Sequence, residues 1–238
     1  MQKVVILTTE RSGSTLLCDL LDQCKNSRFY GELFNSTEIQ MRRETIRTSV
    51  ALQDRDASPV EFLQKTMLSA QNEGLEVVGF KFFFYHHETV LQHLIEDITW
   101  KIVVLQRENL LARYSSLRIA ERTGEWGVLR HTQPTPLLLR FDEGDFEDFE
   151  GKAHAMRELV MRGLSLGGRE IFLMDFVSIL DRRTLDRLAA YLEMDIPETI
   201  VPRIRKQNPT QTINRFSNPD HVRSYLAARN RQRWAFEG

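Results

Sequence analysis

Five consecutive residues near the start of the chain, Arg11-Ser12-Gly13-Ser14-Thr15, are suited to binding a phosphate group. They follow a continuous apolar run, Val4 to Leu7, and precede leucines at helical spacing. A loop between a buried strand and a helix offers backbone N–H groups and the positive end of the helix dipole to an anion. Gly13 permits a close approach of the backbone, and Arg11 adds a guanidinium. A helix capped by one serine would leave the other residues without a role, so we predict a phosphate-binding loop.

The common phosphate-binding patterns are absent from this loop. No glycine opens it and no lysine precedes Ser14 or Thr15, so the pattern G-x-x-x-x-G-K-[ST] of nucleoside triphosphatases does not match. The dinucleotide pattern G-x-G-x-x-G does not match either. The kind of phosphate ligand must therefore be inferred from a second motif.

Arg107 and Ser115, eight residues apart, form a second candidate anion site. Arg107 closely follows the apolar run Lys101 to Leu105, so it would leave the carboxyl end of a parallel strand, where open α/β sheets bind ligands. Ser115 lies about two turns into the helix predicted next, from which it can face the same anion. Each residue alone is more simply a polar surface residue, but the pair at this spacing predicts a second phosphate contact.

The two motifs together resemble those of sulfotransferases that use 3'-phosphoadenosine 5'-phosphosulfate (PAPS). The run Arg11 to Leu17 is similar to their 5'-phosphosulfate loop, closest to the bacterial trehalose-sulfotransferase and nodulation-factor sulfotransferase type. Many eukaryotic members have a lysine at the position of Arg11. Arg107 and Ser115 match the family's 3'-phosphate motif. The resemblance implies an enzyme, a transferase that moves a sulfuryl group in line from PAPS to a hydroxyl of a carbohydrate or glycolipid acceptor, with no metal required.

The resemblance also suggests catalytic groups. Trehalose-type enzymes have a glutamate in a G-x-x-E-F-F-like segment, and Glu32 in the segment Tyr30 to Asn35 is the candidate general base, although the register and Leu33 depart from that pattern. Arg11 would stabilise charge on the sulfuryl oxygens. A surface carboxylate is the alternative for Glu32. Lys81 interrupts an apolar strand, either to reach the site or to extend toward solvent. His86, His87 and His131 are the other candidate bases, although we interpret them first as structural or acceptor-contacting residues.

Four apolar runs that alternate with helical patterns predict the fold class. The runs are Val4 to Leu7, Val77 to Phe83, Lys101 to Leu105 and Glu170 to Met174. Strands in alternation with helices indicate a central parallel sheet flanked by helices, a P-loop-like three-layer α/β fold. We expect a single sulfotransferase domain over residues 1–238.

Two irregular segments, 34–75 and 123–151, lie between these elements, and the first is polar and mostly helical in character. Thr123 to Glu150 is predicted to contact the acceptor, because long insertions in α/β folds commonly carry substrate contacts. Within it, Phe146 and Phe149 interrupt the acidic run 142–150, so we predict a solvated loop anchored by aromatic side chains in preference to a metal site. The basic stretch 203–206 could close over the nucleotide or form a solvated loop, and the sequence leaves both possibilities open.

The overall composition excludes several classes of partner. The net charge of the 238 residues is -1, so nothing global attracts the chain to nucleic acid or to an anionic membrane. The two cysteines, Cys18 and Cys24, fall in one predicted helix and are too few for a disulfide scaffold. No apolar run approaches the roughly 20 residues of a membrane span. These features predict a cytoplasmic protein, and they are compatible with a homo-oligomer.

Two other functions remain open. A P-loop nucleotide kinase would share the fold, but it needs a loop lysine and a strand-end aspartate, and this chain has Gln106-Arg107 after the third apolar run. A non-catalytic nucleotide-binding domain on a degenerate sulfotransferase fold would keep the anion sites and lose the base. A catalytic role of Glu32 would therefore distinguish a sulfotransferase from a non-catalytic nucleotide-binding domain.

Overall fold

The computed structural model describes residues 1–42, 44–126, 135–166, 168–204 and 207–237. The chain forms two compact units, Met1–Gln106 with Val160–Val201 and Arg107–Leu159 with Pro202–Gly238. It therefore leaves the first unit after Gln106, returns at Val160 and leaves again after Val201. The expectation of a single domain over 1–238 stays a prediction.

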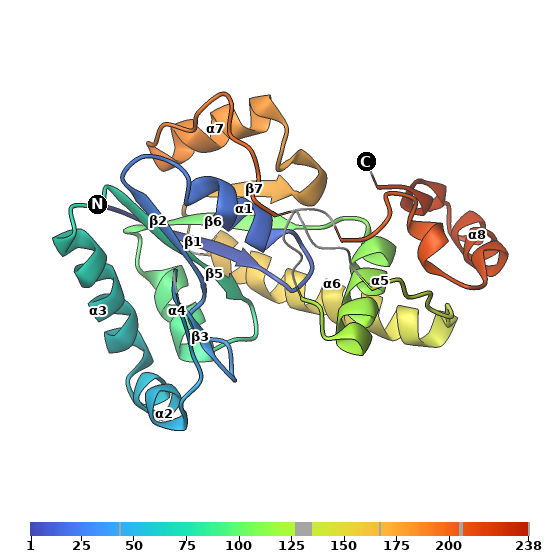
Figure 1. Cartoon of the computed structure of the whole chain (residues 1–238), viewed down its shortest axis with the longest axis horizontal. Helices are drawn as coiled ribbons and strands as arrows, with labels where there is room; N and C mark the ends of the chain where they lie inside the picture. The colour runs from blue at the N-terminus through green and yellow to red at the C-terminus, as the bar shows by residue number, and fades with distance from the viewer. Residues whose placement is uncertain (43, 127–134, 167, 205–206, 238) are drawn as a thin grey trace. The chain divides into compact units, whose positions relative to one another are not determined.

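A five-stranded parallel sheet forms the centre of the first unit (Figure 1). Its strand order is β2-β5-β1-β6-β7, and all four strands predicted from apolar runs are present. Continuous apolar runs suit these strands because a central parallel strand is covered on both faces, and Val4 to Leu7 are fully buried. The strand bounds are β1 Gln2–Thr8, β2 Ser27–Glu32, β5 Val77–Phe83, β6 Trp100–Gln106 and β7 Ile171–Asp175.

Helices cover both faces of this sheet, so the predicted three-layer α/β fold is confirmed (Figure 1). α1 (Ser14–Leu21) and α7 (Arg182–Leu192) pack on one face through leucines at helical spacing. α3 (Pro59–Asn72) and α4 (Glu88–Glu96) lie on the other face. The loops at the carboxyl ends of the strands are thereby held on a rigid three-layer scaffold.

The two cysteines do not share a helix, so that prediction was wrong. α1 ends at Leu21, and Cys24 lies beyond it. Both thiols are free and buried. Burial raises the pKa of Cys18 to about 12 and that of Cys24 to about 11, so both thiols stay protonated at neutral pH.

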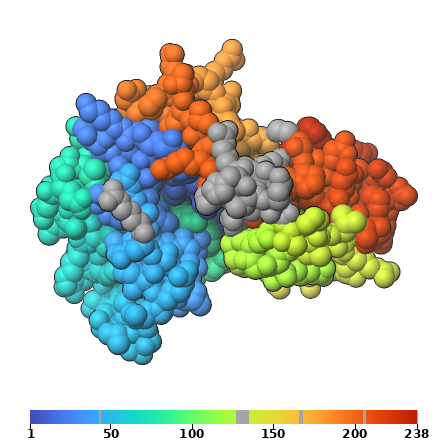
Figure 2. Space-filling view, in the orientation of Figure 1, coloured from blue at the N-terminus to red at the C-terminus, as the bar shows by residue number. Residues whose placement is uncertain are grey.

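The connection between β2 and α3 is built from short elements. β3 (Ile39–Gln40) and β4 (Thr45–Ile46) form an antiparallel pair, and α2 (Ser49–Ala57) follows them. α2 lies at the surface of the first unit (Figure 2), and Arg55 is its one buried residue. A surface helix with one buried arginine suggests that this side chain has a specific partner.

The second unit is mainly helical and has its own aromatic core. α5 (Leu110–Thr123), α8 (Pro219–Ala228) and the first part of α6 (Glu143–Leu166) contribute to this core. Two short 3-10 helices, η2 (Thr212–Arg215) and η3 (Gln232–Ala235), also pack into it. This core joins segments that are distant in the sequence: Phe146 of α6 packs against Tyr114 of α5 and Tyr225 of α8.

The acidic run 142–150 forms the start of α6, so the prediction of a solvated loop was wrong. Phe146 and Phe149 are buried one helical turn apart and pack against Tyr114. The Asp142 side chain accepts a hydrogen bond from the backbone N–H of Asp145 at 2.9 Å, which caps the first turn. Acidic residues also stabilise a helix N-terminus through the helix dipole. The two phenylalanines are thus core positions of a helix, and the acidic residues between them are exposed.

Candidate functional site

The predicted phosphate loop follows β1, the central strand of the sheet. β5 and β2 lie on one side of β1, and β6 and β7 lie on the other. The order of the strands therefore reverses beside β1, and the crevice at the carboxyl ends there is where open α/β sheets bind ligands. The Thr8 hydroxyl donates a hydrogen bond of 2.7 Å to the Leu105 carbonyl, which fixes the end of β1 against β6.

Gly13 determines the shape of this loop. Its φ of 88° lies in the left-handed region that favours glycine. A Cβ at this position would lie 2.5 Å from Phe176 Cδ2 and 2.8 Å from Ile179 Cδ1, so a side chain does not fit. Arg11 also has a positive φ, of 61°, which is uncommon for a residue other than glycine. The backbone therefore curls tightly at both residues, as the sequence predicts for a phosphate loop.

The serines of the loop do not cap α1. Gly13 occupies the N-cap position, and no side chain caps the helix. The Ser12 hydroxyl instead lies 3.1 Å from the Thr9 hydroxyl, within the loop. The first turn of α1 thus keeps N–H groups that no side-chain cap satisfies, which is the arrangement that helices use to bind anions.

Lys81 on β5 connects the phosphate loop to the candidate base. Its Nζ donates a hydrogen bond of 3.0 Å to Thr15 Oγ1 and lies 3.0 Å from Glu32 Oε1. All but a small part of the lysine side chain is buried, whereas Thr15 is exposed. Of the two alternatives that the sequence left open for Lys81, the structure therefore shows the one that reaches the site.

A β-bulge brings Glu32 opposite Lys81. β2 pairs with β5 so that Tyr30 faces Phe80 and Glu32 faces Lys81, which leaves Gly31 as an extra residue. A Cβ on Gly31 would lie 2.5 Å from Gln40 Oε1, and that oxygen accepts a hydrogen bond from the Glu32 backbone N–H at 3.1 Å. Glu32 is thus the last residue of an edge strand, a strand that the sequence analysis did not predict.

The Glu32 carboxylate is buried and already accepts hydrogen bonds. Asn35 Nδ2 donates to Glu32 Oε2 at 2.8 Å, and His86 Nε2 lies 3.5 Å from the same oxygen. Burial raises the pKa of Glu32, but the hydrogen bond from His86, the positive charge of Lys81 and the Asn35 amide together lower it to about 2. The carboxylate is therefore ionised at neutral pH.

Arg55 supports this cluster from α2. Its guanidinium Nη1 donates hydrogen bonds to the carbonyls of Leu33 at 3.1 Å and of Asn35 at 2.7 Å. The guanidinium also pairs with Asp56, 2.7 Å from Nε to Oδ1. Arg55 thereby fixes the backbone that carries the Asn35 amide, which explains why this arginine is buried on a surface helix.

The three candidate histidines differ in their positions. His86 Nδ1 accepts a hydrogen bond of 3.1 Å from the Phe83 backbone N–H, so the proton of the neutral ring is on Nε2 and faces Glu32. His87 occupies the N-cap position of α4 and has a buried Nδ1 without a hydrogen-bond partner. His131 lies outside the described residues. Of the two described histidines, His86 is thus the one that joins the Glu32 cluster.

The second unit contains the other predicted pair. Arg107 is buried, and its guanidinium binds the Glu237 carboxylate through two hydrogen bonds, one of 2.7 Å from Nε and a shorter one from Nη2. Ser115 is also buried and accepts a hydrogen bond of 3.0 Å from Arg215 Nη1. Arg215 Nη2 lies 3.8 Å from Glu237, so these residues form one network.

Glu237, Arg215 and Asn35 are site residues that were not predicted from the sequence. The first two lie about 100 residues or more along the chain from their partners, and no local pattern connects them. Asn35 had a local signal, because an amide three residues after a candidate base can reach its carboxylate. Of the basic stretch 203–206, residues 205 and 206 lie outside the described residues.

Comparison with protein-family models and with characterised proteins finds no match to this chain. Within the described ranges, no group of three or more His, Cys, Asp or Glu side chains is arranged to hold a metal ion. No helix in the described part of the chain has the length and apolarity of a membrane span. The functional interpretation therefore depends on the two clusters themselves.

The buried ion pair predicts a specific dependence of stability on pH. The pKa of Glu32 is about 2 in the folded protein, below the ordinary value of 4.5, so its contribution is complete above pH 4.5 and decreases as the pH falls from there toward 2. Glu32→Gln should cost about 3 kcal/mol of unfolding free energy at pH 7 and progressively less below pH 4.5. Urea unfolding of both proteins between pH 7 and pH 3 measures this difference.

Glu44→Gln is the matched control, because Glu44 is exposed. Its unfolding free energy should stay close to that of the wild type at every pH. A constant difference between wild type and Glu32→Gln across this range would contradict the assignment.

Proposed function

We propose that this protein is a sulfotransferase that moves a sulfuryl group from PAPS to a hydroxyl of a carbohydrate or glycolipid acceptor. The observation that carries the proposal is the position of Lys81, whose ammonium group contacts both the phosphate loop at Thr15 and the Glu32 carboxylate. An anion-binding loop and a candidate base are thus joined by one buried cation. A cytoplasmic location, a homo-oligomer and the independence from metal stay predictions from the sequence.

In the proposed reaction, the loop holds the 5'-phosphosulfate end of PAPS. The N–H groups at the start of α1, the Arg11 guanidinium and the loop hydroxyls would stabilise negative charge on the sulfuryl and bridging oxygens. The acceptor oxygen forms a bond to sulfur while the bond from sulfur to the 5'-phosphate oxygen breaks, and 3',5'-ADP leaves. The acceptor proton goes to Glu32. Positioning and charge stabilisation would account for most of the rate enhancement.

The pKa of Glu32 needs to rise before this carboxylate is an effective base, because a group with a pKa of about 2 takes up a proton poorly at neutral pH. Lys81 supplies a route. When a sulfuryl group occupies the loop, its oxygens would compete with Glu32 for the ammonium group. As Lys81 turns from the carboxylate toward the sulfuryl oxygens, the pKa of Glu32 rises. Binding of the donor would thereby activate the base.

The proposal assigns the 3'-phosphate to Arg107 and Ser115. Arg107 binds the Glu237 carboxylate through two hydrogen bonds, which is also the geometry in which arginine binds a phosphate. A 3'-phosphate at this guanidinium would therefore replace Glu237. The measured affinity for the nucleotide would be the net result of this exchange.

The class of nucleotide can be tested by thermal unfolding with 3',5'-ADP, ATP and GTP, each with and without Mg²⁺. A sulfotransferase should be stabilised preferentially by 3',5'-ADP and equally with and without the metal, because ligands that bind the folded state raise Tm. Greater stabilisation by ATP with Mg²⁺ would favour the nucleotide kinase. Stabilisation by 3',5'-ADP without sulfuryl transfer to any of a panel of sugars would favour the non-catalytic nucleotide-binding domain.

Arg107→Ala should weaken binding of 3',5'-ADP by about ten- to a hundredfold and leave 5'-AMP nearly unchanged, because loss of a charged hydrogen-bond partner costs roughly 1.5–3 kcal/mol. Glu237→Gln should have the opposite effect and tighten 3',5'-ADP, since a neutral amide competes less well for the guanidinium. Titration calorimetry with both nucleotides measures these affinities.

Both substitutions break a buried ion pair and lower the stability of the protein without ligand, so a general loss of structure would weaken binding in both. Opposite signs exclude that explanation. Equal weakening of 3',5'-ADP and 5'-AMP by Arg107→Ala would remove Arg107 from this role.

Glu32→Gln should reduce kcat by about 10²–10⁴-fold, the usual contribution of a general base, while the affinity for 3',5'-ADP stays within about twofold of wild type. The amide keeps the shape of the side chain and removes its basicity. Glu44→Gln serves again as the matched control and should retain full kcat. A Glu32→Gln enzyme with near-normal kcat at saturating PAPS and acceptor would show that another group takes the proton, and His86 would be the next candidate.

A further inference from the structure

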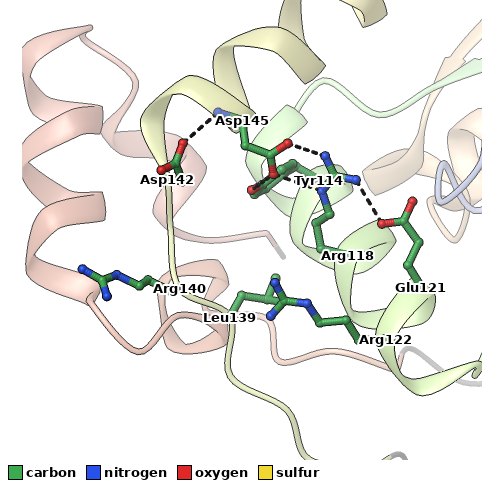
Figure 3. A pocket seen from close by; sticks show the side chains of 8 residues that line it. All are labelled: Tyr114, Arg118, Glu121, Arg122, Leu139, Arg140, Asp142 and Asp145. Atoms are coloured by element: carbon green, nitrogen blue, oxygen red, sulfur yellow. Dashed lines mark hydrogen bonds and ion pairs between the residues drawn. The ribbon is translucent and has the colours of Figure 1, made fainter.

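A pocket with a volume of about 410 Å³ lies in the second unit, between α5 and the chain that leads into α6 (Figure 3). This volume is within the range of small-molecule sites in proteins. Six of the eight lining side chains are charged, and Leu139 is the one aliphatic residue among them. A ligand that fits this lining must be hydrophilic.

One wall of the pocket is fixed by hydrogen bonds. Arg118 Nε donates to Asp145 at 3.2 Å, and Arg118 Nη1 donates to Glu121 at 3.0 Å. The Tyr114 hydroxyl donates to the same Asp145 carboxylate at 2.6 Å. Figure 3 shows these bonds joining α5 to the first turn of α6. The wall is therefore a preorganised surface, which reduces the entropy that a ligand would have to overcome.

Two arginines of the pocket, Arg122 and Arg140, make no ion pair or hydrogen bond with any residue that the structure describes. Arg122 lies on the same side of α5 as Tyr114 and Arg118, at successive spacings of four residues. In the view of Figure 3, both arginines lie on one side of the pocket, and Asp142 and Asp145 lie on the other. A guanidinium that no described residue binds is suited to a sulfate or carboxylate group of a ligand.

The acidic side of the pocket can accept hydrogen bonds from hydroxyl groups. Asp142 uses Oδ1 to cap α6, and its Oδ2 makes no hydrogen bond within the described chain. The one aromatic ring, that of Tyr114, is covered by the Arg118 guanidinium at 5.3 Å and packs against Phe146. No free aromatic face is thus available in the lining for a nucleotide base to stack on.

We propose that this pocket binds an anionic sugar unit, with its sulfate or carboxylate at Arg122 and Arg140 and its hydroxyls at the acidic side. The lining contains none of the residues proposed to bind PAPS or to take the acceptor proton, although four of its residues lie in the segment predicted to contact the acceptor. Binding of the sugar at this pocket does not require sulfuryl transfer. A protein with such a site would retain sulfated or uronic-acid-containing saccharides whether or not it modifies them.

Titration calorimetry with glucose 6-sulfate, glucuronate, glucose and inorganic sulfate tests the proposal. The two anionic sugars should bind the wild-type protein at least tenfold more tightly than glucose or sulfate alone. Arg122→Ala and Arg140→Ala should each weaken the anionic sugars about tenfold, because each removes one charged hydrogen-bonding partner. Both arginines are exposed, so the variants should fold, and unchanged thermal unfolding would verify this.

Arg157→Ala is the matched control, since Arg157 is also exposed, lies in the same unit and is not part of the pocket. It should bind the sugars as the wild type does. Equal binding of sulfate and glucose 6-sulfate, equal weakening by Arg157→Ala, or no binding of either anionic sugar would overturn the proposal. Affinity for 3',5'-ADP should be the same in all these variants, so this test and that of the sulfotransferase proposal can fail independently.

Discussion

The buried ion pair between Lys81 and Glu32 is the interaction on which the arrangement of the first unit depends. Removing two charges from water costs several kcal/mol per ion, so the pair is tolerated only when its other hydrogen-bonding groups are satisfied. Thr15 accepts from Lys81, and Asn35 donates to Glu32. Each requirement constrains the chain further: the bulge at Gly31 sets the register, and Arg55 fixes the backbone around Asn35. A short segment of edge strand and a surface helix are thereby ordered around one lysine.

The second unit also contains a buried cation that a carboxylate neutralises. Arg107 is a buried guanidinium, and Glu237 satisfies it through two hydrogen bonds. In both units, a cation assigned to an anionic ligand is held by a carboxylate of the protein. Binding of such a ligand would be an exchange of one anion for another rather than an addition. An exchange lowers affinity, because the protein carboxylate must be displaced, and it discriminates against anions that bind arginine or lysine weakly.

The sequence was sufficient for the central strands and for the glycine of the loop, because these depend on local patterns. Four apolar runs predicted β1, β5, β6 and β7, and Gly13 was identified by its neighbours in the chain. For the acidic run, local patterns identified Phe146 and Phe149 as anchoring residues but missed the helix that carries them. Local patterns also failed for Glu237, which pairs with a residue 130 positions away, since no local pattern records a contact at that separation. β2 was missed because Arg28 and Gly31 interrupt it, so it contains no continuous apolar run like those of the other four strands.

The lysine at the phosphate loop, Lys81, belongs to a neighbouring strand, and this position affects which group the loop can stabilise. In nucleoside triphosphatases the phosphate loop supplies its own lysine, whereas here Lys81 comes from the neighbouring strand and contacts the loop at Thr15. Its charge is shared with the Glu32 carboxylate, which is ionised at neutral pH. A sulfuryl group carries one negative charge less than a terminal phosphoryl group, so an adjacent carboxylate repels it less. In the reaction proposed above, a lysine whose charge is shared with a buried carboxylate would therefore oppose a sulfuryl group less than a phosphoryl group.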